Sequence, residues 1–388
     1  MDLTSGYSST DRPEKVTIIS ISFSIMSIDS LDVENEQFSV NGLFVVRWSD
    51  SRLTWTPSDY GDIHFQLMKE SKIWVPAFIV DNSVNDLSVI SDESVLVRAN
   101  YEGIITWWPP GIYKSACDAN IFYFPFDTQT CQISLTSYGY TTQEVDLNVF
   151  KDGIDLSLYQ PNGEWLMLAN ETSIDTFTNA GLDFRRITFS FEMKRRPAFY
   201  GVFYILPILI NSLLTVYTFA LTPESGEKIA FCLTMMLSYT VLVTLLSEQL
   251  PSSGKISSVL TIYMAIVMVL CAIAVPLAIW VIDLFHRKDS EPIPKWQIQF
   301  TENVLLKIGC RKKKISRLNA VGAVKIKGDD EASPVTPVQV VYNDHVDLYT
   351  PLNWKDLASI LDSVLFRVYF ITVVLTTVIV FTRMVLNI

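Results

Sequence analysis

The sequence predicts an all-β sandwich of the immunoglobulin-like type in residues 1–197, followed by a four-helix transmembrane bundle. Three observations support this fold class. Short segments of alternating apolar and polar residues fill the first half of the 388-residue chain. Four stretches without a charged side chain follow them. Charge also divides the chain, because residues 1–197 carry 27 Asp and Glu against 14 Lys and Arg, whereas the remainder has a small positive excess.

The strands of the first half are predicted from a period of two along the sequence. Val16–Ile25 alternates over ten residues, and Leu43–Trp48 and Arg186–Glu192 are further candidates. Asn162-Gly163 is typical of a turn between strands. Tryptophan is frequent in this half, and we expect core or rim positions for Trp48, Trp55, Trp74, Trp107 and Trp165.

The transmembrane helices are predicted from the uncharged stretches, which are 197–223, 229–247, 256–282 and 368–382. The first three are long enough to cross a bilayer, which needs about 20 residues. The fourth is shorter, but Arg383 can extend its side chain to the interface and let the end of the chain complete the span. The alternative is four buried helices of a large soluble protein. It is disfavoured because each stretch is apolar on nearly every face.

Charged loops predict the orientation. The basic run Arg311–Lys314 lies between the third and fourth spans, and positive loops stay in the cytoplasm. Both termini then lie outside a plasma-membrane protein. The expected parts are an extracellular domain over 1–197, three membrane helices over 198–285, a partly disordered intracellular loop over 286–352, and a fourth membrane helix with a preceding amphipathic segment over 353–388. No cleavable signal peptide is recognised at Met1, which is typical of a mature or trimmed chain.

Cysteines and glycosylation agree with this topology. Cys117 and Cys131 lie in the outer half, where disulfides persist, whereas Cys232 and Cys271 lie in apolar spans and Cys310 lies in the inner loop. We therefore expect one pair outside and three free thiols. Asn170-Glu171-Thr172 is the only glycosylation sequon, so Asn170 is the predicted glycan site.

The second span carries a stripe with the character of a pore lining. Its members are spaced alternately by three and four residues and so share one helix face: Glu227, Ala230, Thr234, Leu237, Val241, Thr244 and Glu248. A lipid-facing stripe would not carry acids, and a core stripe would not carry Ala and Thr at these places. Several copies around an axis would form a water-filled path with charged mouths and a constriction at Leu237 and Val241. The alternative for Glu227 is an acid favoured by the helix dipole. Lys228 lies about 100° round the helix and is expected to face away.

At this point the residues resemble a known family. Cys117 and Cys131 enclose Phe124-Pro125-Phe126-Asp127, which closely resembles the signature loop of the Cys-loop receptors, the pentameric ligand-gated ion channels. Further similar segments are Trp48–Trp55, Ile73–Pro76, Trp108–Ile112, Gly226–Lys228 and Leu250–Ser253. The resemblance covers about residues 12–388. It implies a homopentamer formed with four further copies of the chain, an extracellular small-molecule ligand, permeating Na⁺ and K⁺, and contact with membrane lipid. It implies no cofactor, no metal and no nucleic acid.

The resemblance also implies a gating interface. The Cys117–Cys131 disulfide closes a 15-residue ring, worth about 3 kcal/mol in the chain-entropy model. In the family this ring contacts the loop after the second span, which here runs from Pro251 to Ser257. The expected interface residues are Phe124, Pro125, Phe126, Asp127, Val33, Glu34, Arg195 and Pro251. The corresponding bond is usually cis in the family, so the resemblance implies a cis Phe124–Pro125 bond. A plain stabilising role for the disulfide is compatible with this interpretation.

The ligand site is where the chain departs from the family. Family agonists bind between adjacent subunits in a box of aromatics, often by a cation–π contact with an ammonium. By position, that box falls here on Tyr138, Phe184, Asp81 and Leu43. Phe177 and Tyr140 are nearby aromatics that could compensate, whereas the adjacent cysteines of acetylcholine-binding subunits are absent. A plain nicotinic site is therefore not expected; Asp81 either pairs with an amine or marks a different ligand.

These inferences lead to a cation-selective channel as the predicted function. A ring of Glu227 at the inner mouth and one of Glu248 at the outer mouth would attract cations. Anion-selective relatives carry a Pro-Ala-Arg-like sequence where this chain has Ser225–Lys228. The alternative is a non-conducting or accessory subunit that binds ligand or assembles with related subunits. An enzyme is not predicted, because the three histidines, His64, His286 and His345, form no recognisable nucleophile–base or metal pattern.

Overall fold

The computed structural model describes residues 6–91, 94–250, 257–288, 292–301, 315–317, 347–349 and 353–385. The chain forms two compact units. The first comprises Met1–Pro207 with Val241–Met264 and Val380–Ile388. The second comprises Ile208–Thr240 with Ala265–Ile379.

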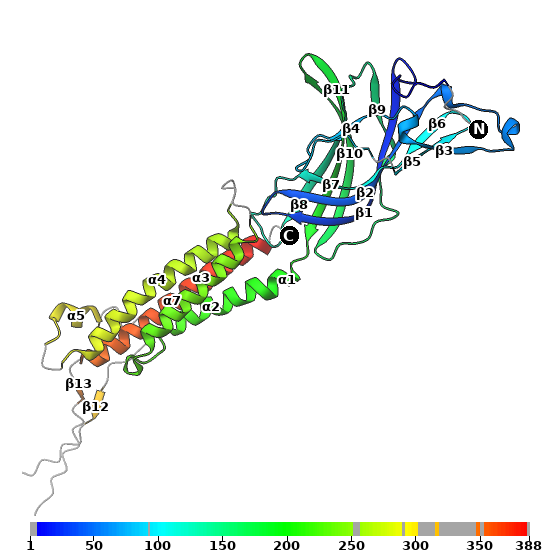
Figure 1. Ribbon diagram of the computed structural model, residues 1–388. Helices are drawn as coiled ribbons and strands as arrows, with labels where there is room; N and C mark the ends of the chain where they lie inside the picture. Colours follow the sequence, from blue (N-terminus) through cyan, green and yellow to red (C-terminus); the bar gives the residue numbers. More distant parts are fainter. Residues whose placement is uncertain are drawn as a thin grey trace, which may run out of the picture. The chain divides into compact units, whose positions relative to one another are not determined.

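The larger sheet of the first unit has seven strands in the order β3-β5-β6-β2-β1-β9, with β7 also paired to β2 (Figure 1). Its strands are β1 (Thr17–Asp32), β2 (Gln37–Ser49), β3 (Phe65–Lys69), β5 (Leu96–Asn100), β6 (Ile104–Trp107), β7 (Pro110–Ala116) and β9 (Val145–Asp155). The pairing of β1 with β9 is parallel, and the other strand pairs of this sheet are antiparallel.

The smaller sheet has four antiparallel strands in the order β10-β11-β8-β4. They are β4 (Phe78–Val80), β8 (Thr128–Ser137), β10 (Trp165–Asn179) and β11 (Leu182–Arg195). The β10–β11 hairpin is paired up to Asn179 opposite Leu182, so a two-residue turn closes it. Both turn residues, Ala180 and Gly181, have positive φ angles of 52° and 79°, as this tight turn requires.

An aromatic core lies between the two sheets. Phe23 and Phe44 of the larger sheet contact Phe189 of β11, and Phe23 also contacts Phe191, with ring centroids 5.8–6.2 Å apart. Tyr113 packs on Phe23 and Phe44 from within the larger sheet. The predicted core or rim positions of the tryptophans are confirmed, because Trp48, Trp55, Trp74, Trp107 and Trp165 are all buried. The alternating pattern of the sequence thus corresponds to the inward and outward faces of a β-sandwich.

The predicted strands are confirmed, but β1 is longer than the sequence pattern. The alternation predicted a strand over Val16–Ile25, and the structure extends it to Asp32. The register with β2 shifts between Ile25 and Ser27 and again between Ile28 and Ser30. A bulge places two residues opposite one and interrupts the period of two. The pattern therefore stops at Ile25 although the strand continues.

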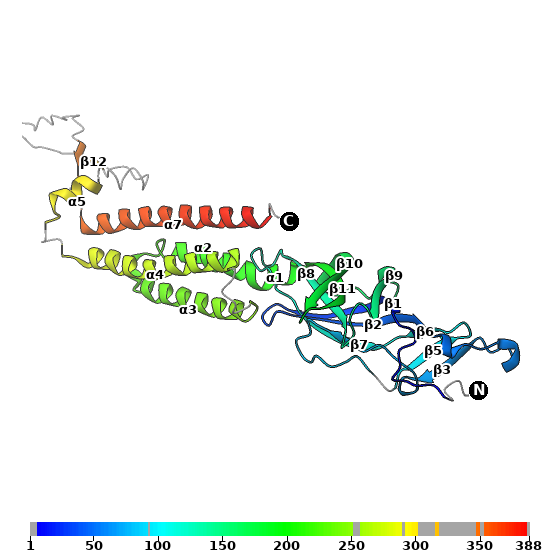
Figure 2. The ribbon, with the colours of Figure 1, turned by 90° about the horizontal axis from the view of Figure 1, so that it is seen from above.

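Within the described residues, four helices are long and apolar enough to cross a membrane, in agreement with the predicted number (Figure 2). The first runs from Ala198 to Tyr217 and consists of α1 (Ala198–Tyr200), a π-helical turn over Gly201–Ile205, and α2 (Leu206–Tyr217). The others are α3 (Lys228–Ser247), α4 (Val259–His286) and α7 (Trp354–Val385). The predicted amphipathic segment from Asn353 and the fourth span form one continuous helix, because no breaker separates them.

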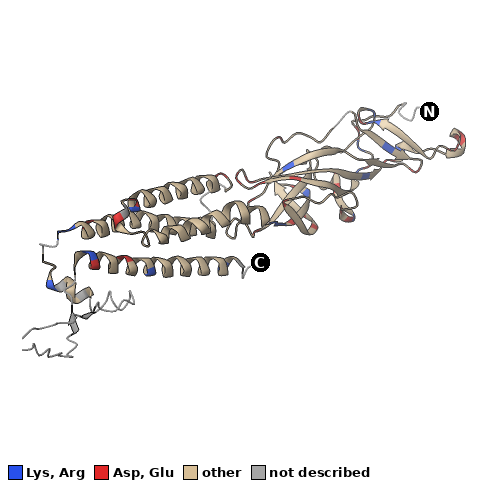
Figure 3. Ribbon diagram, turned by 90° about the horizontal axis from the view of Figure 1, so that it is seen from below, with Lys and Arg blue, Asp and Glu red and all other residues tan. Residues whose placement is uncertain are grey.

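The second unit has an apolar core to which all four membrane helices contribute. One cluster includes Val216 from α2, Cys232 from α3, Ala278 from α4 and Val373 from α7. A second cluster joins α4 to the start of α7 through Val281, Leu284 and Leu357, among others. Figure 3 shows that the middle of α4 and much of α7 carry no charged residue.

The link between α4 and α7 is described only in short pieces. A short helix, α5 (Lys295–Phe300), follows Pro294. Two short strands, β12 (Ile315–Arg317) and β13 (Asp347–Tyr349), pair antiparallel. The basic run Arg311–Lys314, Cys310 and most of the segment expected to be disordered lie outside the described residues.

Candidate functional site

The predicted stripe lies on the exposed face of α3. Its seven members are all exposed, including Leu237 at 66% and Val241 at 50%. The buried side chains of this segment are Lys228, Cys232, Tyr239 and Leu246, each at most 3% exposed. One side of α3 is therefore held in the protein, and the stripe is left free for water, lipid or another copy of the chain.

Polar groups on the stripe are arranged so that their oxygens remain available. The hydroxyls of Thr234 and Thr244 donate to the carbonyls of Ala230 and Val241, each at 2.8 Å. With the donor satisfied by the helix, each hydroxyl oxygen keeps acceptor capacity for a group at the exposed face. The carbonyl of Glu227 accepts the first helical hydrogen bond, from Phe231 N–H at 2.9 Å, so this acid lies at the helix start.

Lys228 faces away from the stripe, as its angle round the helix predicts. Its ammonium forms an ion pair with Asp362 of α7 and lies 5.5 Å from the ring of Phe219. The Lys228 side chain is 0% exposed. This pairing keeps a positive charge off the face that carries Glu227. The sequence did not identify Asp362 as its partner, because the two residues are 134 positions apart.

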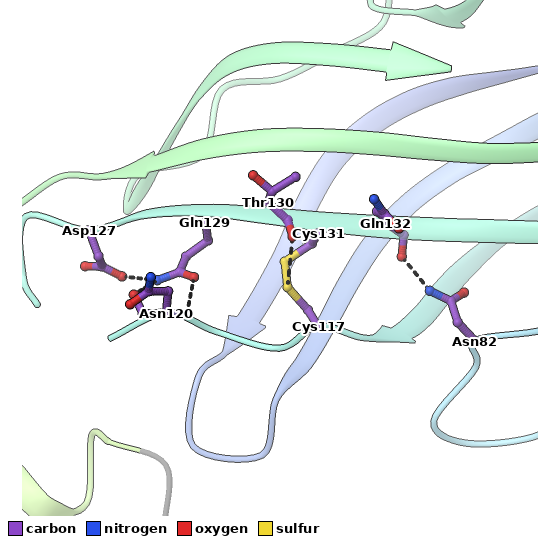
Figure 4. The surroundings of a disulfide bond; sticks show 8 residues. All are labelled: Asn82, Cys117, Asn120, Asp127, Gln129, Thr130, Cys131 and Gln132. Atoms are coloured by element: carbon purple, nitrogen blue, oxygen red, sulfur yellow. Dashed lines mark hydrogen bonds between the residues drawn. A yellow bond between two sulfur atoms is a disulfide. The ribbon is translucent and has the colours of Figure 1, made fainter. Parts of the chain in front are cut away.

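The disulfide ring is present and well braced. Cys117 and Cys131 are bonded (Figure 4). Inside the ring, Gln129 donates to the carboxylate of Asp127 at 2.5 Å and to the carbonyl of Asn120 at 2.9 Å. Figure 4 shows these contacts beside the disulfide. The ring is thus held by side-chain hydrogen bonds as well as by the covalent link.

A buried arginine connects this ring to the end of the sandwich. Arg195 makes a two-point ion pair with Asp127, Nε to Oδ1 at 2.8 Å and Nη2 to Oδ2 at 3.2 Å. Its Nη1 donates to Glu164 at 2.7 Å, which also accepts from the Tyr200 hydroxyl at 2.8 Å. Burial would lower the pKa of Arg195, but the hydrogen bond and charge of Asp127 outweigh it and the pKa is raised. Sequence analysis found Arg195 and Asp127 but missed Glu164 and Tyr200.

The ring also reaches the start of a membrane helix. The backbone N–H of Val259, at the first position of α4, donates to the carbonyl of Phe122 at 2.9 Å. Pro251 and the residues up to Ile256 lie outside the described part of the chain, so their predicted role remains a prediction. The Phe124–Pro125 bond is cis.

Two of the expected interface residues are buried within the ring. Phe124 is fully buried, and Pro125 is also buried. The physical reason is that the Phe124 ring packs 5.0 Å from Tyr200 and 5.1 Å from the Arg195 guanidinium. Phe126 is half-buried, and the exposed aromatic of the ring is Phe122.

The β1–β2 turn, also expected at this interface, is attached to the ring. The N–H of Cys117 donates to the carbonyl of Glu36 at 2.8 Å. Asp32 accepts from the backbone and side chain of Asn35, which holds the turn. These hydrogen bonds lower the pKa of Asp32. Val33 is buried and Glu34 is exposed.

Three of the predicted ligand-site residues meet on one face of the smaller sheet. Phe177 of β10 and Phe184 of β11 are cross-strand partners whose rings stack with centroids 5.6 Å apart. Asp81 follows β4, and its carboxylate accepts from Arg186 Nε at 2.5 Å. The Arg186 guanidinium lies over the Phe177 ring, 4.5 Å from its centroid. Arg186 therefore joins Asp81 to the aromatic pair, and sequence analysis did not identify it.

The other three predicted ligand-site residues have contacts of their own. Tyr140 has its ring 6.3 Å from Trp74 and 5.9 Å from the Arg12 guanidinium. Tyr138 is 60% exposed, with its backbone N–H bonded to Ala77. Leu43 is half-buried on β2, in the other sheet.

Asn170, the predicted glycan site, lies exposed on β10, the edge strand of the smaller sheet. Its position is compatible with a glycan, and the modification stays a prediction. Within the described residues, no group of three or more His, Cys, Asp or Glu side chains is placed to hold a metal ion.

Two family models match the chain. The neurotransmitter-gated ion-channel ligand binding domain matches residues 1–197, and the neurotransmitter-gated ion-channel transmembrane region matches residues 204–344. Similar proteins include the neuronal acetylcholine receptor subunit alpha-2 of Homo sapiens, 30% identical over 75% of this chain and 56% of that protein. Subunit alpha-5 of Bos taurus is 30% identical over 77% of this chain and 63% of that protein. Subunit beta-3 of Homo sapiens is 29% identical over 76% of this chain and 65% of that protein.

The chain spans 56% to 65% of the length of these curated relatives. The sandwich with its disulfide ring falls within the region that the first family model matches, and α2, α3 and α4 fall within the region that the second model matches. These matches place the protein among receptors rather than enzymes. The chain belongs to the neurotransmitter-gated ion-channel family, the Cys-loop receptors, with nicotinic acetylcholine receptor subunits among its relatives.

Proposed function

We propose that this chain is a subunit of a cation-selective, ligand-gated channel of the plasma membrane, in which five copies surround a pore lined by α3. Glu227 and Glu248 would form the charged mouths, with Ala230, Thr234 and Thr244 between them. Leu237 and Val241 would form the hydrophobic constriction, which closes a pore by excluding water.

The observation that carries this proposal is the division of α3 into two faces. The stripe with an acid at each end is exposed, whereas Lys228, one residue after Glu227, is buried against Asp362. A lipid-facing stripe would place two carboxylates in the bilayer interface, where they have no evident role. In a pore-facing stripe the carboxylates form rings, and such rings attract cations and repel anions.

The proposed gating route follows the contacts of the first unit. A ligand on the sandwich would shift β11, whose last residue, Arg195, is joined to Asp127 of the disulfide ring and leads directly into α1. The ring in turn contacts Val259 through Phe122. Motion of the sandwich is thereby coupled to both the first and the third membrane helix.

The proposed topology places the sandwich and the C-terminus outside the cell and the α4–α7 link inside. The four membrane helices support it, since an even number of crossings puts both ends on one side. The ligand is proposed to be a small extracellular molecule bound on the sandwich. Permeating ions are Na⁺ and K⁺.

The test is the reversal potential of Leu237→Ser expressed alone, with sodium chloride diluted on one side of the membrane. A polar residue at the constriction should ease wetting, so current is expected without knowledge of the agonist. A shift toward the sodium equilibrium potential supports a self-sufficient cation pore. A shift toward the chloride potential overturns the role given to Glu227.

A silent channel despite surface expression would favour the second candidate, an accessory subunit that requires related chains. The specific observation behind this candidate is that Arg186 of the same chain lies over Phe177, one of the predicted ligand-site aromatics. Expressing the chain alone and counting subunits in single complexes separates the two candidates.

A further inference from the structure

A cation is already present on the aromatic face of the ligand region, and it belongs to the chain itself. Arg186 lies over Phe177 at 4.5 Å, and Phe177 stacks on Phe184. The same guanidinium is paired with Asp81 at 2.5 Å and lies 3.7 Å from Asp175. An aromatic face beside a carboxylate is the chemistry that binds ammonium ions.

The strand registers explain why these groups meet. Asp175 is opposite Arg186, and Phe177 is opposite Phe184, so the four residues occupy consecutive positions on one face of the β10–β11 hairpin. Asp81 approaches from the other side, because its N–H is bonded to Ser134 of β8, the strand next to β11. The arrangement is therefore built by the sheet and does not depend on a mobile loop.

The charges favour a cation at this place. Asp81 and Asp175 provide two negative charges, and Arg186 neutralises one of them. The Asp81 side chain is only 15% exposed. Burial raises the pKa of Asp81, and the charge and hydrogen bond of Arg186 offset part of that effect. Removal of Arg186 would leave a half-buried carboxylate beside two stacked rings, without its positive partner.

We propose that Arg186 is an internal cationic occupant of this subsite, which excludes external ammonium ligands by competing for Phe177 and Asp81. A tethered group acts at an effective concentration of about millimolar or more. A simple ammonium ion of similar affinity for the rings therefore displaces it only at concentrations well above that value. The inference deepens the proposed function and rests on it only for the assignment of this face to ligand binding.

The test measures binding of tetramethylammonium chloride to the purified full chain by saturation-transfer nuclear magnetic resonance. Wild type is expected to show no binding that depends on Phe177. Arg186→Gln removes the charge and shortens the side chain, and Arg186→Ala removes the side chain beyond Cβ. Both are expected to tighten binding of the probe by at least about tenfold. Adding Asp81→Asn to either variant should abolish the gain.

The chain offers a matched control at the adjacent position. Arg185 has a similar exposure but pairs with Asp146 at 2.9 Å and with Thr176 at 3.2 Å, away from Phe177. Arg185→Gln should leave tetramethylammonium binding unchanged. Arg186→Lys retains a cation and should still exclude tetramethylammonium from Phe177.

Several outcomes overturn the proposal. They are a gain in Arg185→Gln equal to that in Arg186→Gln, no gain in the folded Arg186 variants, or wild-type binding that Phe177→Ala abolishes. The last result can be obtained even if no Arg186 variant folds. The binding measurement does not depend on any current through the channel. A failure of this proposal can therefore be told apart from a failure of the chain to conduct ions.

Discussion

At the scale of single residues, burial decides what an arginine does in this protein. The Arg195 side chain is 3% exposed and its partner Asp127 is 1% exposed, whereas Arg186 is 31% exposed. A buried pair cannot be separated without leaving an unpaired charge in the interior. Arg195 is therefore suited to transmit force, and Arg186 is suited to be exchanged for another cation.

The Arg195 cluster gives a prediction with its control in the same cluster. Asp127→Asn should destabilise the purified chain by about 3–5 kcal/mol, because it leaves a buried guanidinium without its main partner. Glu164→Gln removes the other acid bonded to Arg195, but the Glu164 side chain is 45% exposed. We expect a cost of about 1 kcal/mol or less there. Denaturant unfolding followed by tryptophan fluorescence measures both, and equal costs would contradict the argument from burial.

Asp50 gives the clearest pH prediction. Burial would raise its pKa, but hydrogen bonds from Arg52 and Tyr7 outweigh it, so the pKa lies below its ordinary value of 3.8. A carboxyl with a lowered folded-state pKa contributes stability that is present above 3.8 and is lost as the pH falls through the folded value. Arg52→Gln should therefore reduce stability at pH 6 and flatten the acid loss below pH 4.

Thermal unfolding of the purified chain between pH 6 and pH 2 checks this. The difference between wild type and Arg52→Gln isolates the contribution of Asp50 from that of other carboxylates. Arg185→Gln, which removes a pair that is about one-third exposed on both sides, is the control and should change the profile little. Parallel pH profiles for wild type and Arg52→Gln would refute the assignment.

At the scale of elements, α3 and α7 are joined by a charged pair in an otherwise apolar bundle. Lys228 is fully buried, and Asp362 is 7% exposed. Asp362→Asn alone should be strongly destabilising, by about 3–5 kcal/mol, because it leaves a buried ammonium without a counter-charge. Lys228→Met combined with Asp362→Leu removes both charges and should recover most of the loss.

Thermal stability of the detergent-purified protein measures this double-mutant cycle. The coupling is expected to be large, since the two residues share one contact. Lys355→Met at the solvent-exposed start of α7 is a matched control, because it removes a lysine without burying a charge. Additive effects of the two substitutions would show that the pair does not join these helices.

The elements differ in how far their structure and contacts can be predicted from the sequence. The stripe on α3 was predicted because helix geometry is local and places residues three and four apart on one face. The strand pattern was predicted for the same reason until the bulge at Ile25 interrupted it. Arg186 was not found, because its partner Asp81 is 105 residues away and the pair depends on the order β11-β8-β4. Asp362 was missed because only the packed bundle places it beside Lys228.

At the scale of the whole molecule, the two halves carry different kinds of specificity. The stripe on α3 presents acids and hydroxyls, which in the proposed pore would select ions by charge and wetting. The smaller sheet presents an aromatic ring covered by Arg186, which in our proposal limits the ligands that can bind there. In the proposed channel, the permeant ion is selected by α3 and the ligand by the smaller sheet.

The number of copies around the pore can be read from the charge of one residue. If each copy contributes one Glu227 to a ring, mixtures of wild-type and Glu227→Gln chains, both carrying Leu237→Ser, should give discrete single-channel sodium conductances. One conductance class is expected for each possible number of variant copies, with conductance falling as carboxylates are lost, because the local cation concentration falls with the ring charge. Asp283→Asn removes an exposed carboxylate from the end of α4 and should leave a single class in the same mixtures. A single class with Glu227→Gln as well would mean that this side chain does not face the permeating ion, and the pore would have to be assigned to another face of the bundle.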